Sequence, residues 1–74
     1  MKIIYMHEDN APKHNLTIYS YVVELQEGLY SAVVVTVKDN DPVDVCFTGR
    51  DADKVINKCV ALADWALNHY AWEE

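Results

Sequence analysis

Glycine is scarce in this chain, which has two glycines among 74 residues. Loops that cradle phosphate groups need several closely spaced glycines, and Gly28 and Gly49 lie far apart in the sequence. No phosphate-cradling loop of this kind can therefore be formed.

Positive charge is also scarce, because six Lys and Arg residues face twelve Asp and Glu residues, for a net charge of -6. Binding to nucleic acid or to anionic membrane needs positive charge, so both functions are disfavoured. A negative surface instead suits a protein partner with a basic surface, such as the nucleic-acid groove of another protein. The same charge is equally typical of a surface that only keeps the protein soluble.

Long apolar runs are missing. The stretch Ile3–Met6 is far too short for the apolar region of a signal peptide, and no run approaches the roughly 20 residues of a membrane span. A cytoplasmic location is therefore expected. In that compartment Cys46 and Cys59 would be reduced, and we expect both to be small buried hydrophobic residues.

No catalytic or metal-binding motif is recognisable. The polar residues His7, Glu8, Asp9 and His14 match no compact ligand spacing and indicate a solvated loop over residues 7–15. The neighbours of both cysteines are mainly apolar or acidic, which would raise a thiol pKa rather than lower it. We therefore expect no enzyme, no cofactor and no metal.

The apolar pattern predicts one α+β domain over residues 1–74. Its antiparallel sheet has three to four strands, and one long C-terminal helix packs on one face. The tight turn at Glu27–Gly28 and the turn signal at residues 39–42 separate the strands. The expected strands cover about residues 1–6, 16–26, 29–38 and 43–47, and the helix covers about residues 51–70.

The strand over residues 29–38 is apolar on both faces around Val33, Val34 and Val35. A sheet covered on one side only should have one clearly polar face. This pattern indicates a central strand whose second face is covered by another chain, and it predicts a homodimer at micromolar concentration.

The helix is expected to begin at a capping box in which Thr48 is the cap and Asp51 is the third residue. At 100° per residue, one face of the helix collects its apolar side chains in a stripe about 27 Å long. The stripe contains Ala52, Val55, Ile56, Cys59, Ala63, Ala66, Leu67 and Tyr70.

The opposite face of the helix has Trp65 and Trp72, with Ala61 and Asn68 between them. Large aromatic residues that point outward are enriched at binding hot spots, so these four residues predict a partner-binding surface. The alternative is that Trp65 folds over the helix edge and that Trp72 lies beyond a frayed helix end.

Acidic residues gather in the sequence around the last strand and the helix start. They could form a negative patch that imitates phosphates and occupies a basic groove. Alternatively they are only the charges of a solvated turn and of a helix start. These residues are Asp39, Asp41, Asp44, Asp51 and Asp53.

Two segments carry a family resemblance. The sequence "YSYVVELQEGLYSAVVV" resembles the opening hairpin of HicB-like antitoxin domains, and "CFTGRDADKVINKCVALADWAL" resembles their last strand and helix. The chain departs from that family in having "DNDPVDVCF" where a Pro-rich segment ending in Gly-Cys is usual. It also lacks the Gly-Asp-Thr run at the helix start. No functional residue is carried over.

In size, charge and α/β character the chain is also similar to small acidic inhibitors of phages and other mobile elements, including anti-CRISPR proteins. That resemblance implies a non-catalytic inhibitor that blocks a host protein which handles nucleic acid. The alternative is a HicB-like antitoxin or a small dimeric regulatory protein.

Overall fold

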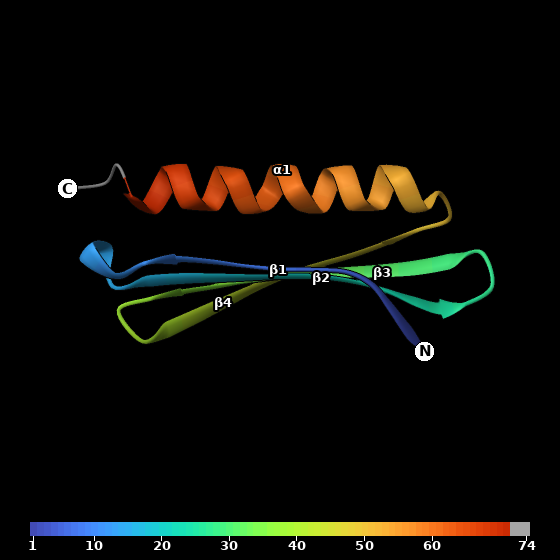
Figure 1. Ribbon diagram of the computed structural model, residues 1–74, viewed down its shortest axis with the longest axis horizontal. Coiled ribbons are helices and arrows are strands. Elements are labelled where there is room, and N and C mark those ends of the chain that lie inside the picture. Colours follow the sequence, from blue (N-terminus) through green and yellow to red (C-terminus); the bar gives the residue numbers. More distant parts are fainter. Residues whose placement is uncertain (72–74) are drawn as a thin grey trace.

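A computed structural model describes residues 1–71 and has two layers, a sheet and a helix that lies lengthwise along one of its faces (Figure 1). The sheet is antiparallel throughout, with its four strands in the order β1-β2-β3-β4. The predicted α+β fold is confirmed. The elements are β1 (Lys2–Ala11), the short 3-10 helix η1 (Pro12–His14), β2 (Leu16–Gln26), β3 (Leu29–Lys38), β4 (Asp41–Gly49) and α1 (Ala52–Ala71).

Two-residue turns join the three strands β2, β3 and β4. In the first, Gly28 has a φ of 75°, a backbone region that costs glycine little. In the second, Asp39 and Asn40 have φ angles of 53° and 66°. Two consecutive positive φ angles are typical of the type I′ turn, whose twist matches that of the flanking strands.

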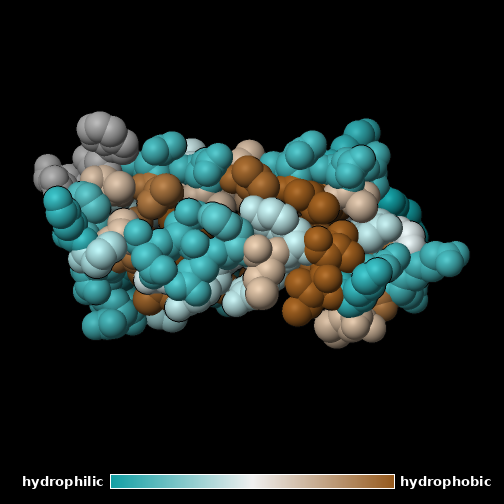
Figure 2. Space-filling model, in the orientation of Figure 1, coloured by the Kyte–Doolittle hydropathy of each residue, from teal (hydrophilic) through white to brown (hydrophobic). Residues whose placement is uncertain are grey.

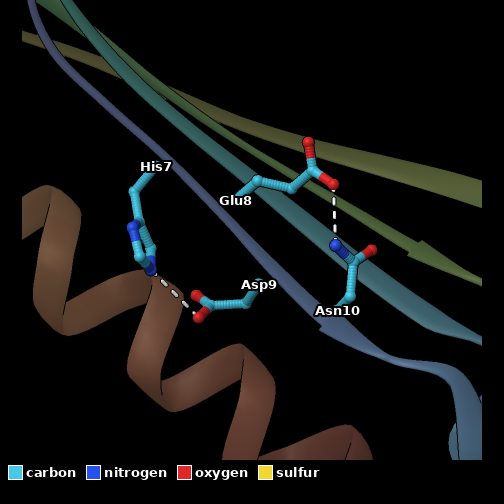
Figure 3. Close-up of polar contacts among 4 residues, drawn as sticks. All are labelled: His7, Glu8, Asp9 and Asn10. Carbon is cyan, nitrogen blue, oxygen red and sulfur yellow. Dashed lines mark hydrogen bonds and ion pairs between the residues drawn. The ribbon is translucent and has the colours of Figure 1, made fainter.

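The expected loop over residues 7–15 is wrong for residues 7–11, because β1 continues to Ala11 and pairs with β2 as far as Leu16, and only residues 12–15 form the connection between the strands. Its polar side chains satisfy one another across two residues, as side chains on one face of a strand can. His7 Nε2 lies 3.1 Å from Asp9 Oδ1 on the side of the helix, and Asn10 donates to Glu8 at 2.7 Å on the other side (Figure 3). The polar residues from 7 to 11 therefore belong to an exposed edge strand and not to a loop.

The fourth strand is longer than predicted, and its end displaces the expected helix cap. Thr48 still belongs to β4, where it pairs with Ser31, so it cannot be the cap. Asp51 takes that position, since its Oδ1 accepts a hydrogen bond from the backbone N–H of Lys54 at 3.2 Å. Pro42 is tolerated near the start of β4 because this strand is an edge of the sheet.

The core lies between α1 and the covered face of β2 and β3. The predicted helix stripe is confirmed from Val55 to Tyr70, with Leu62 as a further contributor and with Ile56, Leu67 and Tyr70 at its margin, whereas Ala52 is only half-buried. The buried side chains are small, and the fully buried core contains no aromatic residue within residues 1–71. They are Leu16, Ile18, Val22, Ala32, Val34, Val55, Cys59, Ala63 and Ala66.

The two cysteines differ in environment. Cys59 is fully buried, its thiol donates to the carbonyl oxygen of Tyr21 at 3.9 Å, and burial raises its pKa. Cys46 is exposed, so the expectation that both are buried is wrong for this residue. The reason is its register: Cys46 pairs with Val33, on the sheet face opposite the helix.

Candidate protein-binding surfaces

Trp65 is the most prominent aromatic residue on the outer face of α1. It is 60% exposed, so it does not fold into the core. Its indole stacks on the imidazole of His69, one helical turn later, with ring centroids 4.8 Å apart and an interplanar angle of 7°. The stack restrains a large aromatic side chain that faces solvent.

Ala61 and Asn68 are exposed on the same helix, as the sequence predicted. Trp72 lies outside the described residues. The residues from Cys59 to Ala71 include Asp64 and neither Lys nor Arg. The surface around Trp65 therefore has an aromatic centre with Asp64 beside it in sequence, and Lys58 lies two helical turns before Trp65 on the same helix.

The second surface is the face of the sheet that points away from α1, here called the open face. Strand alternation puts every second residue of β2 and β3 there, and no element of residues 1–71 covers it (Figure 1). Its two central strands carry no charge on this side. They contribute Thr17, Tyr19, Tyr21 and Val23 from β2, and Ser31, Val33, Val35 and Val37 from β3.

The edge strands extend the open face with more apolar side chains. Ile3 and Met6 of β1 are 58% and 65% exposed, and Cys46 of β4 lies beside Val33. A shallow depression of about 260 Å³ runs along β1 and β2 and is lined partly by Met6 and Tyr21. In the edge-on view, hydrophobic surface is visible between the two layers and near the N-terminal end of β1 (Figure 2).

The predicted acidic cluster is not brought together. Asp39 and Asp41 lie at one end of β4, and Asp51 and Asp53 follow its other end. Nine residues of strand separate these ends by roughly 26 Å, in a molecule 42 Å long. Asp44 lies between them, opposite Val35 on the open face. All five carboxylates are exposed, which agrees with charges at a turn and a helix start.

Basic residues moderate the charge at the helix start. Arg50, Lys54 and Lys58 line a depression of about 200 Å³ there, together with Asp51. The ammonium of Lys58 lies 4.6 Å from the centroid of the Phe47 ring. A continuous negative patch is therefore absent from this end of residues 1–71.

Metal binding and membrane crossing each require a specific arrangement of residues. Within residues 1–71, no three His, Cys, Asp or Glu side chains are grouped closely enough to hold a metal ion. Over the same residues, no helix is long and apolar enough to cross a membrane. The cytoplasmic location stays a prediction.

Compared with known protein families, curated proteins and solved structures, the chain shows no match. The resemblances to antitoxin domains and to small acidic inhibitors therefore stay predictions.

Sequence reasoning identified only part of the open face. It noted the doubly apolar strand around Val34 but did not connect it with Tyr19 and Tyr21 of the neighbouring strand. The period-two alternation of β2 was visible, yet joining the two strands required their register. Met6 was missed because β1 was expected to end there.

Proposed function

We propose that this chain is a non-catalytic protein-binding module that uses the outer face of α1, centred on Trp65, to bind a protein with a basic surface. The observation that carries the proposal is the exposure of Trp65 in a defined orientation. Tryptophan can bury roughly 150–250 Å² on contact and is enriched at binding hot spots. Because the indole is already stacked on His69, ordering it on binding costs little further entropy.

Charge supports the basic character of the partner. The net charge of -6 raises the rate of encounter with a positive surface and opposes encounter with a negative one. Near Trp65, Asp64 adds a negative charge and Lys58, two turns earlier, adds a positive one, so the attraction to a basic partner comes mainly from the net charge of the whole chain. Proteins that handle nucleic acid have such basic surfaces. We therefore propose that this chain inhibits a protein of that class and is itself an inhibitor of the phage or mobile-element type.

The mode of inhibition differs from simple phosphate imitation. The five aspartates around β4 are divided between two ends of the molecule, so they offer no row of closely spaced charges. An aromatic anchor on a chain with a net charge of -6 agrees better with this arrangement. Affinity should still fall with salt, because exposed charges are screened over about 8 Å at physiological ionic strength.

The experiment compares capture of partners from a lysate by the wild type, Trp65→Ala and Val43→Ala. Val43 is 49% exposed and lies on β4, away from both the outer helix face and the open face, so it controls for loss of an exposed apolar side chain. We expect a protein that the wild type and Val43→Ala capture and that Trp65→Ala loses. Titration with that purified protein should show a loss of about 2 kcal/mol for Trp65→Ala.

Circular dichroism melts provide the folding control, and both variants should melt close to wild type because both side chains are exposed. Equal capture by all three proteins would place the interface elsewhere. Affinity that does not change with salt would argue against a basic partner and leave only the aromatic contact.

The open face favours the second candidate function, a dimeric regulatory or antitoxin-like protein. An exposed sheet face whose two central strands are uncharged and largely apolar is typical of an interface between chains. The two functions are compatible, because the open face and the outer helix face lie on opposite sides of the molecule (Figure 1).

A further inference from the structure

We propose that two copies of this chain associate through their open faces and form a homodimer with four layers, helix–sheet–sheet–helix. The inference does not depend on the function of Trp65, because it concerns the other side of the molecule. It commits to a second copy of the chain as the occupant of the open face.

The open face has enough area for a dimer interface. Four strands at about 4.8 Å spacing and about ten residues at 3.3 Å each give a face of roughly 19 by 33 Å. Two such faces would bury about 1,200 Å², which lies at the lower end of the range for specific, stable interfaces. One sheet face of this chain is therefore large enough for a dimer without any further element.

The charge distribution of the open face is compatible with pairing to a second copy of the same face. Along β2 and β3 the open face has aromatic, β-branched and hydroxyl side chains and no charge, as residues such as Tyr21 and Val33 show. The charged side chains Glu8 and Asp44 lie on the outer strands. A two-fold axis near the centre would bring neutral surface onto neutral surface and leave the carboxylates at the rim, where water and salt screen them.

The same neutrality argues against a basic partner at this site. A positively charged partner would be attracted mainly by carboxylates. The carboxylates lie at the rim of the open face or on other surfaces of the molecule, and not at the centre of this face. The uncharged centre of the open face instead favours an apolar partner surface. A second copy of the chain carries such a surface, and it is present wherever the protein is made.

Association by strand edges is disfavoured, which leaves the face as the route. The pairing of β1 with β2 is irregular between Ile3 and Tyr5. On the other edge, β4 contains Pro42, which lacks an N–H donor, and the exposed Asp44. Irregular pairing, proline and charge on edge strands all oppose edge-to-edge pairing.

The small core of this domain also favours self-association. The core contains small aliphatic side chains, and small domains bury only a modest fraction of their surface on folding. Self-association is one of the usual ways in which such domains gain stability. Covering the half-buried side chains of β2 and β3 would add a second apolar layer to the same sheet.

This arrangement would make the protein bivalent. With the sheets in the middle, both copies of α1 lie on the outside, and each carries its own Trp65. Two linked binding surfaces can raise apparent affinity for a partner with two sites by 10²–10⁴-fold.

The first test is sedimentation velocity in the presence of a reductant, which prevents disulfide formation through Cys46. We expect the wild type to shift from 8.5 kDa toward twice that mass at micromolar concentration. Val33→Lys, at the centre of the open face, should remain monomeric. Val45→Lys is the matched control: Val45 is 46% exposed on the same sheet but faces the helix side, so this variant should dimerise like wild type.

Cys46 supplies a second test that needs no mutation. Its thiol lies on the open face, while Cys59 is buried, so a thiol reagent applied to the folded protein reports on Cys46. Labelling of the wild type should be at least tenfold slower at high concentration, where the dimer forms, than at low concentration, where the chain is monomeric.

Two results would overturn the proposal. One is a wild type that remains at 8.5 kDa and is labelled at one rate at all concentrations. The other is a dimer that persists in Val33→Lys or that leaves Cys46 as reactive as in the monomer. If Val33→Lys fails to fold, the concentration dependence of wild-type labelling decides alone. Both tests use no other protein, so their failure would leave the proposed role of Trp65 untouched.

Discussion

Gly49 lies so close to Val55 that a Cβ added at Gly49 would come within 2.7 Å of Cγ2 of Val55. Val55 is buried in the first turn of α1, so it has little room to move. The chain thus turns from β4 into α1 through a contact that only glycine allows. Gly49 is required here for space, whereas Gly28 is required for its positive φ.

Gly49→Ala should therefore lower the free energy of unfolding by about 1–3 kcal/mol, the usual cost of overpacking. Urea unfolding measures the change. In a Val55→Ala background the same substitution should cost clearly less, since the clashing methyl group is gone. An equal cost in both backgrounds would mean that the contact is not the cause.

Ser20→Ala should stabilise the protein by about 1 kcal/mol. Ser20 is fully buried in β2 beneath the helix, and its hydroxyl has no hydrogen-bond partner among residues 1–71. A buried hydroxyl without a partner retains its desolvation cost. Ser31→Ala is the control, because Ser31 is only half-buried on the open face and its change should be smaller. Thermal melts of both variants at one low protein concentration decide the comparison, and a destabilised Ser20→Ala would contradict it.

The helix start gives a direct comparison between the predicted and the observed cap. Asp51→Ala should cost about 1 kcal/mol, because it removes the acceptor for the N–H of Lys54. Thr48→Ala should change stability far less, since Thr48 is an exposed residue of β4. Urea unfolding of the two variants measures both costs. The reverse order would restore the capping box that the sequence suggested.

The sequence predicted the helix and the central hairpin well because each has a strong local signal. The helix stripe repeats with the period of an α-helix, and Gly28 marks the turn between two alternating strands. The cap was misplaced because Thr48 and Asp51 fit a motif whose validity depends on where β4 ends. That end is set by pairing with β3, which is not local information.

For the candidate binding surfaces too, features with a local sequence signal were predicted and features that depend on the folded structure were not. Trp65 was identified correctly as outward-facing, because its position on the helix follows from the period alone. The stack with His69 was not predicted, since it depends on side-chain rotamers. The aspartates from Asp39 to Asp53 looked like a cluster only because proximity in sequence was taken for proximity in space, and an extended strand separates them.

Alkaline pH should destabilise the protein through Tyr5 and Cys59. Burial, with smaller contributions from Cys59, Asp9 and Asp64, raises the pKa of Tyr5 above its ordinary value of 10.0. Burial likewise raises the pKa of Cys59 above 9.0. Both groups thus keep their protons in the folded state at a pH where the unfolded chain releases them.

The sign follows from this difference in bound protons. The stabilising contribution is complete below the unfolded pKa values and is lost as pH rises through the higher folded values. The free energy of unfolding should therefore begin to fall near pH 9, where Cys59 ionises in the unfolded chain, and should fall more steeply above pH 10 as Tyr5 follows. Tyr5→Phe should show a shallower fall above pH 10, because it removes one of the two groups. Urea unfolding from pH 7 to 11 measures both curves, and identical slopes above pH 10 would show that Tyr5 is not involved.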